Sequence, residues 1–313
     1  MGATVDRWVV GGGRRLSPEA EGVGLETSAT WVPDPRKRDP SNVGFSFIPA
    51  APQLSASTAV KESDEERWER LLREATLGTP VVAQSFVKAW PTFSRPVSIE
   101  GDDGHSYVVK GLRTDQPAMP HAITTERTAG LLGQALGAPV PDVVLVDVSG
   151  LVAVEPAMAH MIPGVVHGTR ELDHCSERLA VTAPGTDRNK KVFAGLAVLY
   201  GWFQAADHQL VATMDPPGDV YSVDHGHFLP GGPTWSAATL LSASPPAPDP
   251  NFAPHTRPAD LEEVARRLEQ IDDRGIAQAL GQPTSWGVPL ADRVALGQYL
   301  SSRRVKMIEL LGG

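Results

Sequence analysis

Four charged side chains stand at spacings that suit phosphoryl transfer. Lys110 ends a short β-prone run, and Glu126 follows sixteen residues later in the first turn of an expected helix. Asp207 comes just after an amphipathic segment, and Asp224 ends a short strand seventeen residues further on. Phosphoryl transfer requires cations on the phosphates, a carboxylate to hold a metal ion and a group that orients the incoming hydroxyl. Each requirement has a candidate here, in a suitable order along the chain.

Each of these residues also has an ordinary explanation. An isolated lysine is usually a solvated surface group, and so is an aspartate just past a helix. A glutamate in the first turn of a helix is favoured by the helix dipole. An Asp-x-Gly turn such as Asp224-His225-Gly226 is a common device, although it also lets the carboxylate face a bound magnesium ion. The phosphotransfer interpretation therefore depends on the four residues taken together.

The elements expected around these residues change character along the chain. Residues 1–60 are rich in Gly, Pro, Ser and charge, which predicts a disordered or extended segment. The expected elements after it are a helix over 62–77, a hairpin over 96–110, a helix over 124–137, a second hairpin joining VVLVDV to LVAV at Ser149-Gly150, a helix over 190–204, a strand over 219–224 and two closing helices. This order predicts an α+β fold with a strand-rich first half and a helical second half.

Composition narrows the class of protein. A net charge of −9 and a pI near 5.5 argue against a general nucleic-acid binder and mildly against anionic lipid. One cysteine, Cys175, excludes an intramolecular disulfide framework, and no apolar run has the length of a membrane span. We expect a cytoplasmic protein without a membrane span that does not bind nucleic acid by itself.

Several segments around Lys110, Glu126, Asp207 and Asp224 resemble those of a known family. These segments are Ser94-Arg95-Pro96-Val97, Asp103-Gly104, Tyr107-Val108-Val109-Lys110-Gly111, the passage LGAPVPDVVLVDV at 136–148, Pro163 to Thr169, Asp207-His208 and Val223-Asp224-His225-Gly226. In order and spacing they resemble HipA-like serine/threonine kinases, and the two acidic motifs also resemble those of phosphatidylinositol kinases. The similarity covers about residues 90–230.

The resemblance implies a bilobal protein-kinase-like fold that uses ATP and Mg²⁺. We expect a nucleotide-binding N-lobe over residues 61–156 and a helical C-lobe over residues 157–313, which carries the catalytic and metal-binding loops. The implied activity is transfer of the γ-phosphoryl group to a hydroxyl of a protein serine or threonine. Some relatives imply an antitoxin-like partner, which nothing in this chain demonstrates.

The resemblance also assigns roles to residues. Lys110 would contact the nucleotide phosphates with Glu126 as its partner, and Asp207 would orient or deprotonate the acceptor hydroxyl. Asp224 would bind Mg²⁺, and Gln209 is the nearest amide that could join it. The remaining implied nucleotide contacts are Ser94 and Arg95 in a loop over the phosphates and Glu155 to Met158 at the adenine.

Two departures keep other functions open. Ala212 stands where the family usually has an asparagine that serves as a second metal ligand, and the loop Trp90 to Arg95 lacks glycine. Both favour a pseudokinase, a nucleotide-binding regulatory module without catalysis. A metallohydrolase is the third alternative, because its metal could be held by the two aspartates and several histidines. Those histidines are His160, His167, His174, His208, His225 and His227.

Overall fold

Five strands of the chain form a closed barrel in the order β1-β2-β3-β5-β4. The structure is a computed structural model that describes residues 62–176, 186–214 and 218–312. The barrel strands are β1 (Val81–Ala89), β2 (Val97–Gly101), β3 (Ser106–Lys110), β4 (Val143–Asp147) and β5 (Val165–Arg170). All neighbours are antiparallel except β1 and β4, which are parallel. The residues predicted to be disordered, 1–60, lie outside the described part of the chain.

The predicted hairpin over 96–110 is present as β2 and β3. The two strands pair with Val97 opposite Val109 and Ile99 opposite Tyr107, and all four of these side chains are buried in the barrel core. Gly104 makes the turn at φ 77°, a backbone conformation that favours glycine. This pairing fixes the strand that ends at Lys110.

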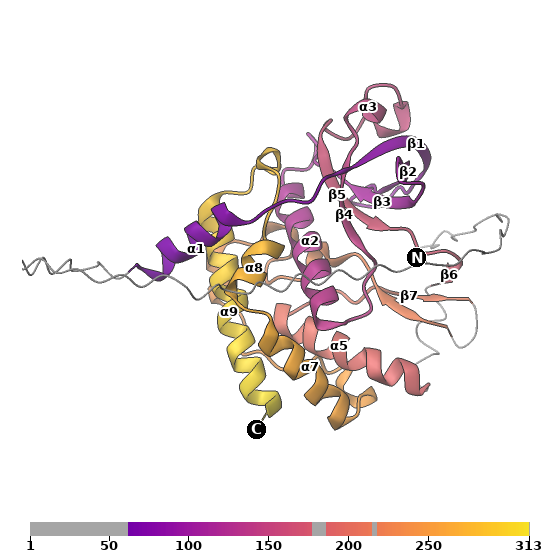
Figure 1. Cartoon of the computed structure of the whole chain (residues 1–313). Coiled ribbons are helices and arrows are strands. Elements are labelled where there is room, and N and C mark those ends of the chain that lie inside the picture. The colour runs from indigo at the N-terminus through magenta and orange to yellow at the C-terminus, as the bar shows by residue number, and fades with distance from the viewer. Residues whose placement is uncertain (1–61, 177–185, 215–217, 313) are drawn as a thin grey trace, which may run out of the picture. The chain divides into compact units, whose positions relative to one another are not determined.

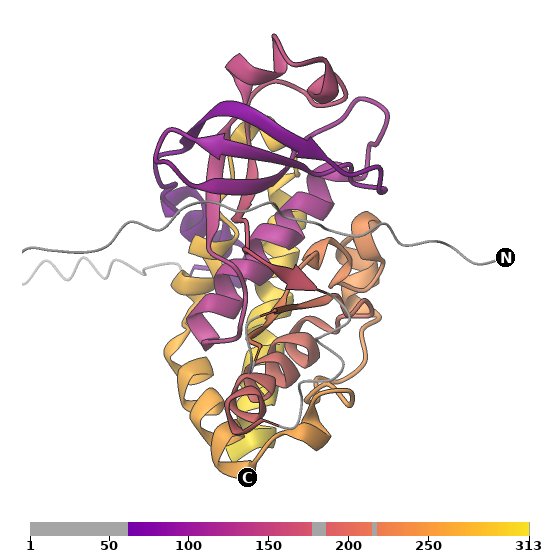
Figure 2. The same ribbon diagram turned by 90° about the vertical axis from the view of Figure 1, so that its right-hand side faces the viewer.

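Helix α2 (Met119–Leu136) lies between the barrel and the helical part of the molecule (Figure 2). It begins five residues before the predicted start, because Pro120 stands in its first turn, where a missing N–H costs nothing. Thr124, Thr125 and Thr128 lie buried inside the helix and donate hydrogen bonds to backbone carbonyls four residues earlier. The helix is buried on most sides, so its charged residues need partners in the interior.

The helical part surrounds a second core (Figure 1). Its helices are α1 (Asp64–Glu74), α5 (Asp187–Phe203), α6 (Ala237–Leu241), α7 (Pro258–Gln270), α8 (Asp273–Ala279) and α9 (Leu290–Gly312). Trp202 of α5 is fully buried and donates from its ring nitrogen to the carbonyl of Leu300 in α9 at 2.8 Å. A buried tryptophan usually finds such a partner, and here it joins two helices.

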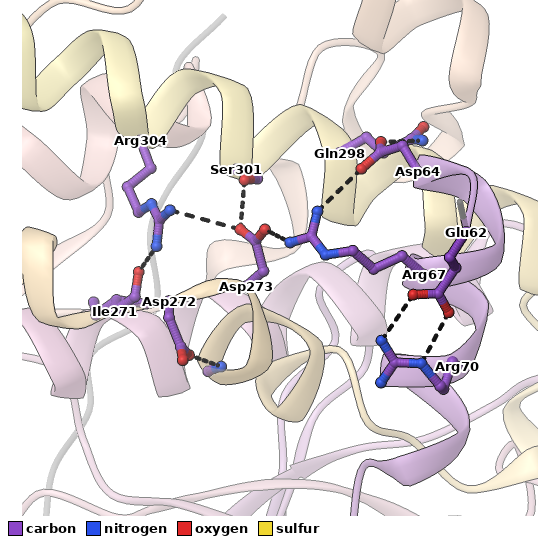
Figure 3. Close-up of polar contacts among 11 residues, drawn as sticks. Glu62, Asp64, Arg67, Arg70, Ile271, Asp272, Asp273, Gln298, Ser301 and Arg304 are labelled. Atoms are coloured by element: carbon purple, nitrogen blue, oxygen red, sulfur yellow. Dashed lines mark hydrogen bonds and ion pairs between the residues drawn. The ribbon is translucent and has the colours of Figure 1, made fainter. Parts of the chain in front are cut away.

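Aspartate 273 ties the first helix to this core. Asp273 accepts hydrogen bonds from Arg67 in α1 and from Ser301 in α9, the latter at 2.5 Å, and lies 3.6 Å from the guanidinium of Arg304 (Figure 3). The guanidinium of Arg304 also donates to the carbonyl of Ile271. One carboxylate therefore holds α1, α8 and α9 together.

A small second sheet positions the acidic residues. It consists of β6 (Cys175–Ser176), β7 (Leu210–Thr213) and β8 (Val220–Ser222), paired antiparallel in that order. Strand β7 follows Asp207 and β8 precedes Asp224, so the two acids stand at the same end of the β7–β8 pair. The predicted strand over 219–224 is present in shortened form.

The barrel and the helical part both contain segments from either side of residue 156, the predicted lobe boundary. Strand β5 lies beyond that boundary, yet it pairs with β3 and β4 in the barrel, so the strand-rich part extends to Arg170. Helix α1 lies before the boundary, but it packs on α8 and α9. The strand-rich and helical parts therefore exchange segments at both ends of the predicted N-lobe.

The second predicted hairpin is wrong. Ser149 begins a short helix, α3 (Ser149–Val152), because the side chain of Asp147 accepts a hydrogen bond from the Ser149 N–H and turns the chain. The antiparallel partner of β4 is β5, which starts fifteen residues further on than Gly150. In the described part of the chain, no helix is long and apolar enough to cross a membrane.

Candidate active site

Lysine 110 joins two acidic residues at the junction of the barrel and the helical part. Its ammonium lies 2.9 Å from Oε1 of Glu126 and 2.6 Å from Oδ1 of Asp224. The side chains of Lys110 and Glu126 are 10% and 4% exposed, whereas that of Asp224 is 36% exposed. Strand β3, helix α2 and the turn after β8 thus each contribute one charged group, and only Asp224 faces outward.

The pKa values of these groups reflect burial opposed by pairing. Burial acts against the charge of Lys110, but Glu126 and Asp224 outweigh it and raise the pKa of the ammonium above its usual value. Burial raises the pKa of the Glu126 carboxyl despite the nearby ammonium. Burial also acts upward on Asp224, yet Lys110 outweighs it and holds the pKa of that carboxyl below its usual value. Lys110 and Asp224 are therefore both charged at neutral pH.

The turn that carries Asp224 is shaped by close packing against α2. Asp224 has φ 58° and ψ 60°, a left-handed conformation that aspartate tolerates better than most residues. A Cβ on Gly226 would lie 3.2 Å from Oε2 of Glu126, so a larger residue here would press on this carboxylate. His225 is buried behind the turn, and Ser222 links its ring to the hydroxyl of Tyr200 at 2.9 and 2.7 Å.

Aspartate 207 lies in the irregular connection between α5 and β7. The Asp207 side chain accepts a hydrogen bond from the amide of Gln209 at 3.3 Å. The next residue, His208, lies 2.9 Å from Asp249 and stacks on the ring of Tyr200. Asp207 is half-buried and Gln209 is exposed, so this pair is held less tightly than the lysine and its partners.

Two cavities meet at these residues. One, of about 150 Å³, has apolar walls from Pro96 and Val108 of the barrel and from Val211 and Val223 on the opposite side, with Lys110 in its lining. The other, of about 210 Å³, is lined mainly by the loop after β1, the N-terminus of α2 and the acidic residues; these are Thr92, Phe93, Ser94, Lys110, Met119, Ala122, Ile123, Asp207, Gln209, Asp224, Gly226 and His227. The first cavity is therefore mainly apolar, whereas the second is lined by several charged and polar groups.

The donor set at the second cavity fits a hard cation. Mg²⁺ prefers oxygen ligands and is often bound through one or two carboxylates plus substrate oxygens. The Asp224 carboxylate and the Gln209 side chain could supply such oxygens. Among the described residues, no three His, Cys, Asp or Glu side chains converge in a metal-binding group, so the metallohydrolase alternative gains no support.

Comparisons with known proteins find a family match for part of the chain and solved structures with a similar fold. Residues 87–212 match the model of the HipA-like kinase family. The chain contains a HipA-like kinase domain. The crystal structure of the Helicobacter pylori proinflammatory kinase CtkA aligns at a TM-score of 0.51 and 11% identity, over 74% of this chain and 96% of that one. The golgi casein kinase aligns at 0.33 and 10% identity, over 80% and 78%. No curated protein matches the chain.

The likeness to CtkA shows the fold of the HipA-like kinase domain. It is the protein-kinase-like fold, with a strand-rich N-terminal sheet and a helical C-terminal part, as the sequence predicts. The predicted grouping of Lys110, Glu126, Asp207, Asp224 and Gln209 is also present, because all five line the cavities described above.

Three of the predicted nucleotide contacts lie elsewhere in the HipA-like kinase domain. Met158 is buried in the barrel core, and the Glu155 side chain accepts a hydrogen bond from the Ala157 N–H of its own short helix. Neither residue lines either cavity. Of the loop residues, Ser94 lines the second cavity, whereas the guanidinium of Arg95 lies 3.9 Å from Asp115 outside it.

The first cavity of the HipA-like kinase domain is lined in part by strand β5 and the residues that follow it. Arg170, Glu171 and Leu172 line the edge of this cavity at the end of β5, and His167 lines the cavity from an earlier position in the same strand. The signal for this strand was short: Val165-Val166 is followed by His167 and Gly168, which interrupt the apolar run. Its pairing with β3 and β4 is long-range, so the local pattern did not reveal it.

Proposed function

We propose that this chain is an ATP-dependent phosphotransferase that transfers the γ-phosphoryl group to a hydroxyl of a protein serine or threonine. The family match and the fold support the coarser statement, a kinase-like phosphotransferase. The finer proposal rests on one observation: the Lys110 ammonium forms ion pairs with both Glu126 and Asp224. This arrangement places a fixed cation and an outward carboxylate at one cavity, as phosphoryl transfer requires.

In this proposal the base of the nucleotide lies in the apolar cavity. Val108 and Val211 come from opposite sides of that cavity, so they would contact the two faces of a flat ring. The backbone at Glu171 and Leu172 would meet the edge of the base, because these residues line the end of the cavity where strand β5 stops. Bulky apolar walls exclude water from the ring and orient the phosphates toward Lys110.

The phosphates and the acceptor would meet at the second cavity. Lys110 would stabilise the negative charge of the phosphates, and Glu126 would hold its ammonium in place. Asp224, with Gln209 beside it, would hold Mg²⁺, which when bound neutralises phosphate charge. Asp207 would accept the proton of the acceptor hydroxyl or orient that hydroxyl toward the phosphorus atom.

A pseudokinase remains the second candidate because of one observation at strand β7. Ala212, at the position of the family's asparagine, is fully buried in β7 and pairs with Val220 of β8. It offers no oxygen from its side chain, so Gln209 is the amide that would have to serve as second metal ligand. An antitoxin-like protein is the partner that the family resemblance suggests for either candidate.

The test compares nucleotide binding and phosphoryl transfer with and without Mg²⁺. We expect the wild type to bind ATP more tightly with Mg²⁺ and to transfer labelled phosphate to protein, and Asp224→Asn to lose the Mg²⁺-dependent gain. Asp187→Asn is the matched control, because Asp187 is an exposed residue of α5. Binding without transfer by the wild type would favour the pseudokinase. Absence of Mg²⁺-dependent ATP binding would refute the proposed nucleotide site.

A further inference from the structure

The loop over the second cavity is anchored from behind by a buried arginine. Arg113 is 2% exposed at its side chain and donates from Nε and from one terminal nitrogen to the two oxygens of Asp115, at 2.9 and 2.6 Å. Its other terminal nitrogen donates to the backbone carbonyl of Phe93 at 2.6 Å. Asp115 thus holds the guanidinium in a fixed orientation, and the guanidinium holds the loop.

The same loop is tied at two further points. The ring of His160 lies 3.0 Å from the carbonyl of Arg95, and the ring of Phe93 meets that of His227, with centroids 6.4 Å apart. Arg95 has φ 44°, an uncommon conformation for a residue with a side chain. A loop without glycine is therefore held in one shape by contacts from its surroundings.

Anchoring the Phe93 carbonyl also orients the next amide. In a planar trans peptide the C=O and N–H point in opposite directions, so the N–H of Ser94 points away from Arg113. Ser94 lines the second cavity, whereas Arg113 does not. Within the described part of the chain, no carbonyl accepts from the Ser94 N–H. A free N–H beside Lys110 suits an anionic oxygen.

We propose that Arg113, oriented by Asp115, is a positioning residue that turns the Ser94 N–H toward the phosphates of a bound nucleotide. This inference rests on the proposed nucleotide site. Glycine-rich loops achieve such an arrangement through backbone freedom, and here a side chain imposes it on a loop without glycine. Arg113 itself does not touch the nucleotide.

The test measures the affinity of the full chain for ATP and for adenosine by calorimetry. Arg113→Gln is expected to weaken ATP binding about tenfold, by loss of one charge-assisted contact, and to leave adenosine binding unchanged. Asp115→Asn, which keeps the arginine but loosens it, is expected to weaken ATP binding less, about threefold. Because Asp115 is half-exposed, this second variant tests the inference even if Arg113→Gln does not fold.

A conservative variant distinguishes the positioning of the loop from simple attraction between a positive charge and ATP. Arg113→Lys keeps the positive charge but cannot bind Asp115 with two nitrogens and Phe93 with a third. It is expected to behave like Arg113→Gln, and ATP affinity equal to that of the wild type would show charge attraction and overturn the inference. Equal losses for ATP and adenosine, or no loss for either, would also overturn it while leaving the nucleotide site intact. A wild type that binds neither would overturn the proposed function and this inference together.

Discussion

The two halves of the candidate site are built in different ways. Lys110, Glu126 and Asp224 come from a strand, a buried helix and a tight turn, and they are joined by hydrogen bonds of 2.6–2.9 Å. Asp207 and Gln209 lie in an irregular connection and share one bond of 3.3 Å. The half that would hold the nucleotide is thus assembled before any ligand binds. The half that would align the acceptor is held by fewer and longer hydrogen bonds.

Because of this difference, mutations in the two halves are expected to affect the stability of the protein and the rate of transfer to different degrees. A buried ion pair that loses one partner leaves a charge in a medium of low polarity, which is costly. A half-exposed carboxylate that is removed leaves a space that water can fill. Changes to the first half are therefore expected to lower both stability and nucleotide binding, and a change to Asp207 to lower only the rate of transfer.

The largest effect is expected from Lys110→Met. This change leaves Glu126 and Asp224 without their cation, so we expect a loss of about 3 kcal/mol in the free energy of unfolding. We expect kcat/KM for ATP to fall about 10³-fold, because a charge directed at the phosphates is lost. Urea denaturation and initial-rate kinetics measure the two effects. Lys191→Met, at an exposed position of α5, is the control and is expected to change neither. Loss of activity without loss of stability would contradict the view that this half is held together by the lysine.

Asp207→Asn tests the other half. The variant keeps the size of the side chain and its bond to Gln209 but cannot accept a proton. We expect kcat to fall about 10²-fold, with the affinity for ATP and the midpoint of unfolding unchanged. Single-turnover kinetics at saturating ATP and a binding titration separate these quantities. An equal loss of ATP affinity would show that Asp207 belongs to the nucleotide half, and the division drawn here would be wrong.

The sequence predicted the local parts of this site better than the long-range ones. The hairpin up to Lys110 was predictable because Gly101-Asp102-Asp103-Gly104 provides its turn within a few residues. The pairing of Glu126 with Lys110 was predictable because Glu126 lies in a helix only sixteen residues later in the chain. In both cases the pattern and the contact lie in the same short stretch of chain.

The edge of the first cavity, which we propose holds the base, depends on a distant pairing that the local sequence pattern did not reveal. The family resemblance implied Glu155 to Met158 at this edge, and the local pattern implied a hairpin at Ser149-Gly150. The side chain of Asp147 instead accepts a hydrogen bond from the Ser149 N–H, where α3 begins, and the strand that completes the barrel is β5, paired with β3 some sixty residues earlier in the chain. The buried role of Arg113 was missed for the same kind of reason. Its partner Phe93 lies twenty residues away, and an arginine near a turn usually indicates a surface position.

The smallest expected effect concerns His167, the neighbour of Lys110 across the β3–β5 pair. Burial, with Lys110 and Arg127 nearby, holds the pKa of its imidazole well below its usual value. The unfolded chain therefore takes up a proton below about pH 6.5 that the folded chain does not, and stability falls as the pH falls. From pH 7 to pH 5 we expect His167 to account for about 2 kcal/mol of that fall. His167→Phe should remove this part of the pH dependence in urea denaturation. His105→Asn, at an exposed turn, should not. Identical slopes for wild type and His167→Phe would mean that the imidazole gains its proton in the folded state, and that the buried half is more open to water than its packing indicates.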